Sequence, residues 1–410
     1  MKTIRIKLKA HALYVVLMVA ILVALLSSAF ILLTFHHQSV ELGFELDRRL
    51  RNNANSAIQL VLADPTAVHS SAVDFFGEGL DSVYITQEPW GLFSKVSCKA
   101  VHGERTKKKT HLLGGRIQQP RLALYLSNSN KALGLVGNTQ LAGDVQLPEK
   151  GAERAYAENK SYTGATLFSG AKRTAASQIP VLSNLQQRQM EAYFNGSFAF
   201  DQKIDWTDTE DRVFHPDSTY LLLSNEAIVL SESYQGNLII QSTRKVMISS
   251  SAKLEGVIVL APHIEILQGF QGALQAFGSD SIRVESNTNL LYPTVLAVDG
   301  RMTFAKIVVE DRVEMNACLL AHQPQFRLKE NSLISVGRDI KMKGQIHGGG
   351  YVELKGGTIK GQVYANKLML KTRSSVYENL LMDVAILPSQ LDSCFAGLLF
   401  DDNPKGQLVQ

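Results

Sequence analysis

Three patterns of apolar positions follow one another along the chain. Residues 12–35 form one uninterrupted run without a charged side chain. Because about 20 apolar residues suffice to cross a bilayer as a helix, this run predicts a transmembrane segment. From Val40 to Val61 the apolar residues recur at mostly helical intervals, with basic and amide residues between them. The helix is therefore expected to continue beyond the span as an amphipathic stalk.

The predicted end of this helix is Ala63. Asp64-Pro65 follows, and proline disfavours helix in the residue before it and cannot donate the hydrogen bond that would propagate the helix. At about 1.5 Å per residue, a helix of this extent would be roughly 78 Å long. We therefore expect a basic leader over residues 1–10 and a transmembrane and stalk helix over residues 11–63.

The flanks of the span predict its orientation. Four cations and no acidic residue precede it: Lys2, Arg5, Lys7 and Lys9. By the positive-inside rule, Met1 lies in the cytoplasm and the bulk of the chain lies across a bacterial cytoplasmic membrane, in the periplasm or outside the cell. Membrane lipid is the expected partner of residues 12–35. A cleavable secretory signal is the alternative, since a peptidase site at residues 27–29 would follow a shorter apolar stretch.

The second pattern consists of short runs with strand-like alternation in residues 66–130. Pairs of residues that contain glycine or proline separate these runs, which cover residues 81–87, 92–101, 109–114 and 121–127. Short connections predict an antiparallel meander. We expect this sheet to rest on the end of the stalk helix as a small α+β neck.

The order of basic leader, apolar helix, amphipathic extension and β-rich head resembles that of minor type IV pilins and pseudopilins. The resemblance covers about the first 65 residues. Ala10 stands where such leaders carry a small residue before the cut, which would make His11 the first mature residue. Val15 departs from the glutamate that is usual at the fifth mature position. The resemblance implies lateral packing of the stalk in an assembly; an ordinary signal anchor is the alternative.

In the third pattern, which begins near Leu133, glycine interrupts the apolar positions. The unit apolar-x-Gly-x-apolar recurs at residues 141–145, 254–258 and 359–363. Each unit places a short strand, a glycine where the chain turns without a Cβ clash, and another short strand. Repeated many times, it winds a solenoid whose turns bury aliphatic side chains against their neighbours.

From residue 218 to residue 387 nearly every stretch fits this unit, and no amphipathic run of helical length intervenes. The predicted fold class is mainly β: a right-handed parallel β-helix preceded by the long transmembrane and stalk helix and the small α+β, pilin-like neck. A β-sandwich is the alternative. The recurring glycine favours the β-helix, as does the scarcity of two-residue hairpin turns, for which Asp299-Gly300 is the one candidate.

The run over residues 356–370 also resembles the coils of bactofilins, bacterial β-helix proteins that form polymers. The matching positions are Ile359, Gly361, Val363, Ala365, Leu368 and Leu370. This resemblance implies the same architecture and, as one functional alternative, a polymerising scaffold.

The remaining segments complete the predicted domain organisation. Residues 131–150 are expected to form the first coil, and residues 151–217 an irregular excursion with a short helix that Ser183 caps and Asn195-Gly196 ends. Residues 388–410, which are apolar and then acidic, are expected to cover the last coil, because an open solenoid end is an unpaired edge.

Composition narrows the function classes. The net charge of the chain is +4, which is the charge of the leader, so the body is neutral and lacks the bulk signature of a nucleic-acid binder. Three cysteines, far apart and odd in number, form no disulfide framework. Cys98 shares a period-two face with Leu92, Val96 and Ala100, which predicts a buried side chain and not a nucleophile.

Charged residues of both signs concentrate in one stretch of the predicted β-helix. The candidates are Asp299, Arg301, Glu310, Asp311, Arg312 and Glu314. Paired carboxylates on a β-helix face could cleave a polysaccharide by general acid–base chemistry. Charges at alternating strand positions are also typical of a solvated face, which is the interpretation that we favour. We predict no catalytic, cofactor-binding or metal-binding site and no enzyme.

Two further motifs carry weaker chemical signals. His347-Gly348-Gly349-Gly350 is similar to an oxyanion-hole motif of some esterases, but the sequence lacks the G-x-S-x-G elbow, and a glycine turn between coils is expected. His322 and His347 have no metal-ligand spacing. A basic cluster in a predicted loop, a candidate contact for anionic lipid or envelope polymer, contains Arg105, Lys107, Lys108 and Lys109 with His102 and His111 beside it.

These patterns lead to a structural or adhesive protein anchored in the membrane. Its expected partners are an envelope protein or glycan, and copies of itself or other subunits of a pilus-like or secretion-associated assembly that contact the stalk helix. The alternative of another class is a membrane-tethered polysaccharide lyase or hydrolase, in which Asp299 and Asp311 would converge in one groove.

Overall fold

A computed structural model describes residues 10–66, 72–77, 79–117, 121–206, 218–302, 304–401 and 405–409. The predicted leader before Ala10 and the end of the predicted excursion, residues 207–217, lie outside the described residues. The protein is mainly β, with 49% strand and 18% helix. It forms two compact units: residues 1–59, 69–86 and 97–109 make the first, and the rest of the chain makes the second.

The first unit is built on helix α1, Ala10–Ala63, which has 54 residues. It ends directly before Asp64-Pro65, so the predicted end is confirmed. Its apolar N-terminal part is long enough to cross a membrane, and none of its most apolar window is buried. Large apolar side chains from Leu13 to Phe35 are exposed, as a lipid-facing helix requires.

Beyond the apolar part, one carboxylate fastens α1 to the rest of its unit. The buried Asp81 accepts hydrogen bonds from Arg49 Nε at 2.6 Å and Asn53 Nδ2 at 2.9 Å, and it lies 2.6 Å from His102 Nδ1. Burial alone raises the pKa of Asp81, but the hydrogen bonds from His102, Arg49 and Asn53 outweigh it and lower the pKa below its ordinary value. The helix is thus tied to two separate segments of the first unit.

Strands β1 (Ser82–Trp90), β2 (Phe93–His102) and β3 (Arg105–Arg116) follow one another through two-residue turns. The predicted meander is present, but Glu88-Pro89 lies inside β1 and does not end it. The C-terminal strands β29 (Ala396–Gly397) and β30 (Gly406–Leu408) pair antiparallel with β3. The described part of the tail therefore extends this sheet, and its apolar residues Phe395, Leu398 and Phe400 also join a buried cluster with strands of the second unit. That the tail covers the last coil stays a prediction.

Most of the second unit is a stack of parallel strands, here called the parallel stack, whose strand path closes on itself. Most strands pair with the second strand after them in the chain, as β15 does with β17. The long strand β24 pairs with β25, which directly follows it. Its long central part consists of β12 (Gln202–Asp205), β13 (Tyr220–Ser224), β14 (Ile228–Leu230), β15 (Ser233–Ser242), β16 (Lys245–Ile248), β17 (Lys253–Ile266), β18 (Gln271–Gly272), β19 (Gln275–Val284), β20 (Asn289–Asp299), β21 (Lys306–Val309), β22 (Glu314–His322), β23 (Leu333–Val336), β24 (Ile340–Leu354) and β25 (Gly357–Lys371).

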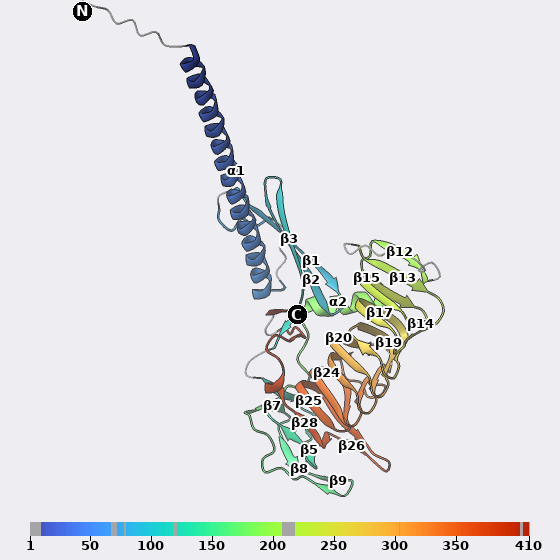
Figure 1. Cartoon of the computed structure of the whole chain (residues 1–410). Helices are drawn as coiled ribbons and strands as arrows, with labels where there is room; N and C mark the ends of the chain where they lie inside the picture. Colours follow the sequence, from blue (N-terminus) through green and yellow to red (C-terminus); the bar gives the residue numbers. More distant parts are fainter. Residues whose placement is uncertain are drawn as a thin grey trace, which may run out of the picture. The chain divides into compact units, whose positions relative to one another are not determined.

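The N-terminal part of the second unit completes the far end of this stack. β4 (Leu122–Leu126) pairs with β25, β5 (Leu133–Val136) with β27, and β6 (Gln140–Leu141) with β28. The segment expected as the first coil therefore adjoins the last strands, while β12 pairs with β13 at the other end (Figure 1). The run that contains β4 belongs to the parallel stack and not to the meander. The remaining short strands are β7 (Asp144–Leu147), β8 (Ala152–Arg154), β9 (Tyr156–Ala157), β10 (Lys160–Ser161), β11 (Lys172–Thr174), β26 (Val376–Glu378), β27 (Leu380–Met382) and β28 (Val384–Ile386).

Aliphatic side chains in register hold the parallel stack together. One inward row has no exposed surface at any position and contains Val246, Ile264, Ile282, Ile307, Ile334, Val352 and Leu368. Each full burial of this kind contributes about 1.5–3 kcal/mol. The period-two alternation of the sequence produces this row, because successive residues of a strand point to opposite sides.

A second apolar cluster lies on one outward side of the parallel stack, here called the covered face. Its row in register consists of Leu221, Ile239, Ile258, Gln275, Val295, Cys318, Gln345 and Gln362. Helix α2 (Asn184–Asn195) lies over this face, and the ring of Tyr193 stacks 5.0 Å from that of Phe277. Ser183 caps α2 and Gly196 ends it in the left-handed conformation, so the predicted caps are confirmed.

Candidate functional site

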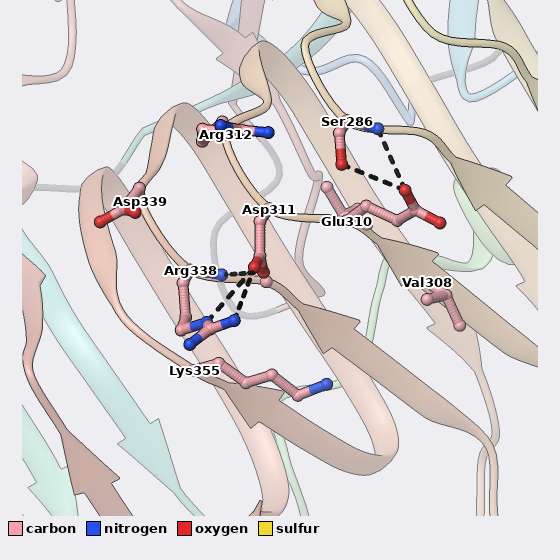
Figure 2. Close-up of a pocket in the computed structure, with 10 residues that line it drawn as sticks. Ser286, Val308, Glu310, Asp311, Arg312, Arg338, Asp339 and Lys355 are labelled. Atoms are coloured by element: carbon pink, nitrogen blue, oxygen red, sulfur yellow. Dashed lines mark hydrogen bonds and ion pairs between the residues drawn. The ribbon is translucent and has the colours of Figure 1, made fainter.

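The largest cleft among those described on the parallel stack is charged. It has a volume of about 660 Å³ and lies where successive strands end at the same corner (Figure 2). We call it the charged cleft; its lining consists of Ser286, Val308, Val309, Glu310, Asp311, Arg312, Gly337, Arg338, Asp339 and Lys355. Three acidic and three basic side chains make the lining neutral overall.

Ion pairs between stacked strands neutralise the acidic residues that the sequence singled out. Arg283 donates to Glu310, which also accepts a hydrogen bond from Ser286 Oγ at 3.1 Å. Arg338 Nη2 lies 3.1 Å from Asp311 Oδ2; dashed lines mark this pair in Figure 2. The two pairs share a sequence separation of 27 residues, and so does the Glu314–Lys341 pair. For Glu314 and Lys341, this separation is the pairing register of β22 with β24.

The protonation states of these carboxylates follow from their partners. The hydrogen bond from Arg283 lowers the pKa of Glu310, and the backbone N–H of Arg338 lowers the pKa of Asp311. Glycoside cleavage with a pair of carboxyl groups needs one that stays protonated, which requires a raised pKa. Glu310 and Asp311 both lack this property.

The remaining charged candidates lie in a different cluster. Asp299 Oδ2 lies 2.8 Å from Arg301 Nη2, and Arg301 Nη1 lies 3.5 Å from Glu191 of α2. Burial raises the pKa of Asp299, but hydrogen bonds from Arg301 outweigh it, so that the pKa is lowered. The structure therefore brings Glu310, Asp311 and Arg312 together but places Asp299 and Arg301 with α2. The predicted convergence of Asp299 with Asp311 is not seen.

The two histidines that the sequence left unconnected line one small cavity of about 70 Å³ beside Pro180 and Gln187. His347 Nε2 lies 3.0 Å from the carbonyl oxygen of Pro180, and its Nδ1 is buried without a hydrogen-bond partner. Burial lowers the pKa of His347 to about 4. His322 Nε2 lies 3.6 Å from Glu191 Oε1, which is too long for a hydrogen bond.

The three glycines that follow His347 do not line this cavity. Gly348, Gly349 and Gly350 lie within β24 and not in a loop, at a shift of its pairing register with β25. Cβ atoms at Gly349 and Gly350 would collide with Gln323 and Ser332, so these glycines permit close packing at a bend. Among the described residues, no three His, Cys, Asp or Glu side chains are grouped so that they could hold a metal ion.

Three glutamines on the covered face were missed by the sequence analysis. Gln275 accepts a hydrogen bond from Leu92 N at 2.8 Å and donates to Trp90 O at 3.0 Å. Gln345 accepts a hydrogen bond from Leu398 N at 2.7 Å and donates to Gln362 Oε1 at 2.8 Å. They attach the β1–β2 turn and the C-terminal segment to the parallel stack. The only feature of the sequence that could have revealed these contacts is a glutamine at a position where the neighbouring strands carry apolar residues.

The four residues of the basic cluster, Arg105 and Lys107–Lys109, lie within strand β3 and not in a loop. Lys107 pairs with Asp47 of α1 at 2.8 Å, and Lys109 donates to Asn55 at 2.6 Å. Part of this cluster thus contributes to the attachment of α1. Lys108 is exposed.

Cys98 is fully buried, as predicted, and burial raises the pKa of its thiol to about 11. A thiol with this pKa stays protonated at neutral pH, which fits a packing role.

Comparison with known proteins adds no relative: the chain matches no protein-family model, no curated protein and no solved structure at a significant level.

Proposed function

We propose that this protein is a membrane-anchored structural or adhesive protein of the bacterial envelope. In this proposal its N-terminus lies in the cytoplasm, α1 crosses the cytoplasmic membrane once, and a right-handed parallel β-helix is held outside. The protein presents rigid faces to an envelope protein or glycan.

The observation that carries the proposal is the division of α1 into two chemically different parts. The large apolar side chains before His36 are exposed, whereas Leu50, Ala54 and Val61 are fully buried. The polar contacts of Asp81, Asp47 and Asn55 all lie on the second part. The first part exposes apolar side chains over the length of a bilayer, and the second part is held by buried and polar contacts. This is the form expected of a membrane anchor with a rigid stalk.

The parallel pairing of the stack and its continuous inward row of aliphatic residues support the β-helix in this proposal. Rigid extended faces suit adhesion or scaffolding. The resemblance of the N-terminal region to minor pilins extends the proposal to a pilus-like or secretion-associated assembly, in which stalk helices pack side by side.

Mass spectrometry of the mature N-terminus from native membranes, together with carbonate extraction of the same sample, tests this function. A retained protein that starts at His11 supports an assembly subunit with pilin-like processing, and a retained protein that starts at Met1 supports a simple anchor. A soluble protein that starts near Phe30 would refute the anchor, because the apolar segment would then be a removed secretion signal.

A further inference from the structure

A second groove on the parallel stack differs from the charged cleft in its excess of cations. It has a volume of about 480 Å³ and crosses β20, β22, β24 and β25. We call it the lysine groove; its lining consists of Asn289, Leu291, Glu314, Met315, Asn316, Lys341, Met342, Lys343, Thr358 and Lys360. Three lysines face one glutamate, so the lining carries a net charge of +2 at neutral pH.

The glycine-centred repeat creates this groove. Residues 342–346 and 359–363 both read apolar, lysine, glycine, glutamine, apolar, and they pair in register. Alternation sends the lysine and the glutamine outward on either side of the glycine. Gln345 and Gln362 lie on the covered face, while Lys343 and Lys360 line the groove. One repeated motif therefore builds a polar pair on each side.

The glutamine pair and the lysine pair differ in whether the two side chains can form a hydrogen bond with each other. Gln345 Nε2 donates to Gln362 Oε1 at 2.8 Å, since an amide is both donor and acceptor. Lys343 and Lys360 are also neighbours in register, but both carry a positive charge. Strands in a sheet lie about 4.8 Å apart, and like charges directly opposite each other disfavour the fold.

Neighbouring carboxylates balance this charge only in part. Glu314 pairs with Lys341 at 2.5 Å, and Asp392 lies 3.6 Å from Lys343. In the described part of the chain, Lys360 has no ion pair. The lysine groove thus holds cations whose charge the described residues do not fully compensate. An external anion would relieve their repulsion.

We propose that the lysine groove binds the oxyanion groups of an acidic envelope polysaccharide, with Lys343 and Lys360 as the contacting cations. The inference rests on the proposed function, because it names the glycan to which the exported part adheres. Asn289, Asn316 and Thr358 supply neutral donors and acceptors for sugar hydroxyls. Leu291 supplies exposed apolar surface against which a sugar ring can pack.

Titration calorimetry on the full chain in lipid nanodiscs tests this proposal. The probes are oligogalacturonate, which carries carboxylates, phosphomannan, which carries phosphates on its sugars, and neutral maltohexaose. We expect binding of one or both acidic polymers, weakened by salt, and none of maltohexaose. The acidic polymer that binds identifies the source of the oxyanion.

A double variant and a matched control locate the site. Lys343→Gln with Lys360→Gln should weaken binding about tenfold or more, because two charge-assisted contacts are lost. The control, Lys253→Gln with Lys306→Gln, removes the same charge from two exposed lysines elsewhere in the stack and should bind as the parent does. Equal losses in both double variants, or no binding of either acidic polymer by the parent, would overturn the proposal. Membrane retention is measured separately, so these results leave the anchoring function untouched.

Discussion

The covered face and the lysine groove are built by the same strands, but they differ in where their polar groups find partners. On the covered face, Gln275 and Gln345 bond to backbone groups of segments that lie far away in the sequence. In the groove, Lys343 and Lys360 are paired in register on neighbouring strands, and both are positively charged. A polar row position in a stack of parallel strands can thus bond a distant segment, pair with a neighbour in the stack, or meet a like charge, as at Lys343 and Lys360.

The largest expected effect comes from the glycine that separates the two sides. A Cβ at Gly361 would collide with the carbonyl of Gly344 in the neighbouring strand. Gly361→Ala should therefore lower the free energy of unfolding by about 3 kcal/mol or more, because the overlap is with backbone that cannot move aside. Thermal unfolding of the full chain in detergent measures this change.

Gly134→Ala provides the control for this substitution. There, the added Cβ would lie 3.1 Å from the Cβ of Ala155 and 3.4 Å from Leu380 Cδ1, so a shift of a few tenths of an ångström relieves the contact. A loss of about 1 kcal/mol or less is expected. If both variants lost the same stability, the separation of the two sides would not depend on the glycine of the repeat.

The next largest effect depends on pH and concerns the covered face. Since the pKa of His347 falls from 6.5 to about 4 on folding, its stabilising effect is complete above pH 6.5 and is lost as the pH decreases toward 4. The loss amounts to about 3 kcal/mol. Urea unfolding at pH 7.5, 5.5 and 4.5 measures it.

His347→Gln should lose less stability over this range than the parent protein. Burial and then Arg301 also lower the pKa of His322, the other histidine of the cavity, so part of the pH dependence should remain in the variant. An unchanged pH profile would mean that His347 is solvated, and that the covering is open at this point.

A smaller effect is expected where the β1–β2 turn is attached. Gln275→Met keeps the length of the side chain but leaves Leu92 N–H and Trp90 C=O without their partner. The expected cost is about 2 kcal/mol, with faster hydrogen exchange of the Leu92 amide. Gln271→Met, at an exposed position, should cost less than about 0.5 kcal/mol. Equal exchange at Leu92 in both variants would show that Gln275 does not hold the turn.

The features that the sequence predicted correctly are set by interactions between residues close together in the chain. The end of α1 at Asp64-Pro65, the caps of α2 and the burial of Cys98 follow from proline geometry, side-chain capping and period-two alternation. The apolar helix and the mainly β content follow from the same kind of signal. Each of these features depends on a few residues that are close together in the sequence.

What the sequence did not predict depends on which distant strands pair. β4 joins β25, and β29 joins β3, although the local pattern placed both elsewhere. His322 and His347 meet because Leu320 and His347 are in register, and no local spacing reveals this. Many strands of similar composition offer similar partners, so the choice among them is made by the packing of the whole stack.

The smallest expected effect on stability concerns the charged cleft. The same substitution tests whether the cleft has a structural or a catalytic role. The side chains of Asp311 and Arg338 are 39% and 72% exposed, so their pair contributes less than about 1 kcal/mol. Asp311→Asn should therefore leave the unfolding temperature nearly unchanged, and Glu226→Gln, at another exposed pair with Arg244, should behave alike. If the parent chain cleaved oligogalacturonate and Asp311→Asn alone abolished the cleavage, the charged cleft would be an active site despite its paired carboxylates. We expect no hydrolysis by either protein, because Glu310 and Asp311 have lowered pKa values and neither can serve as the protonated acid.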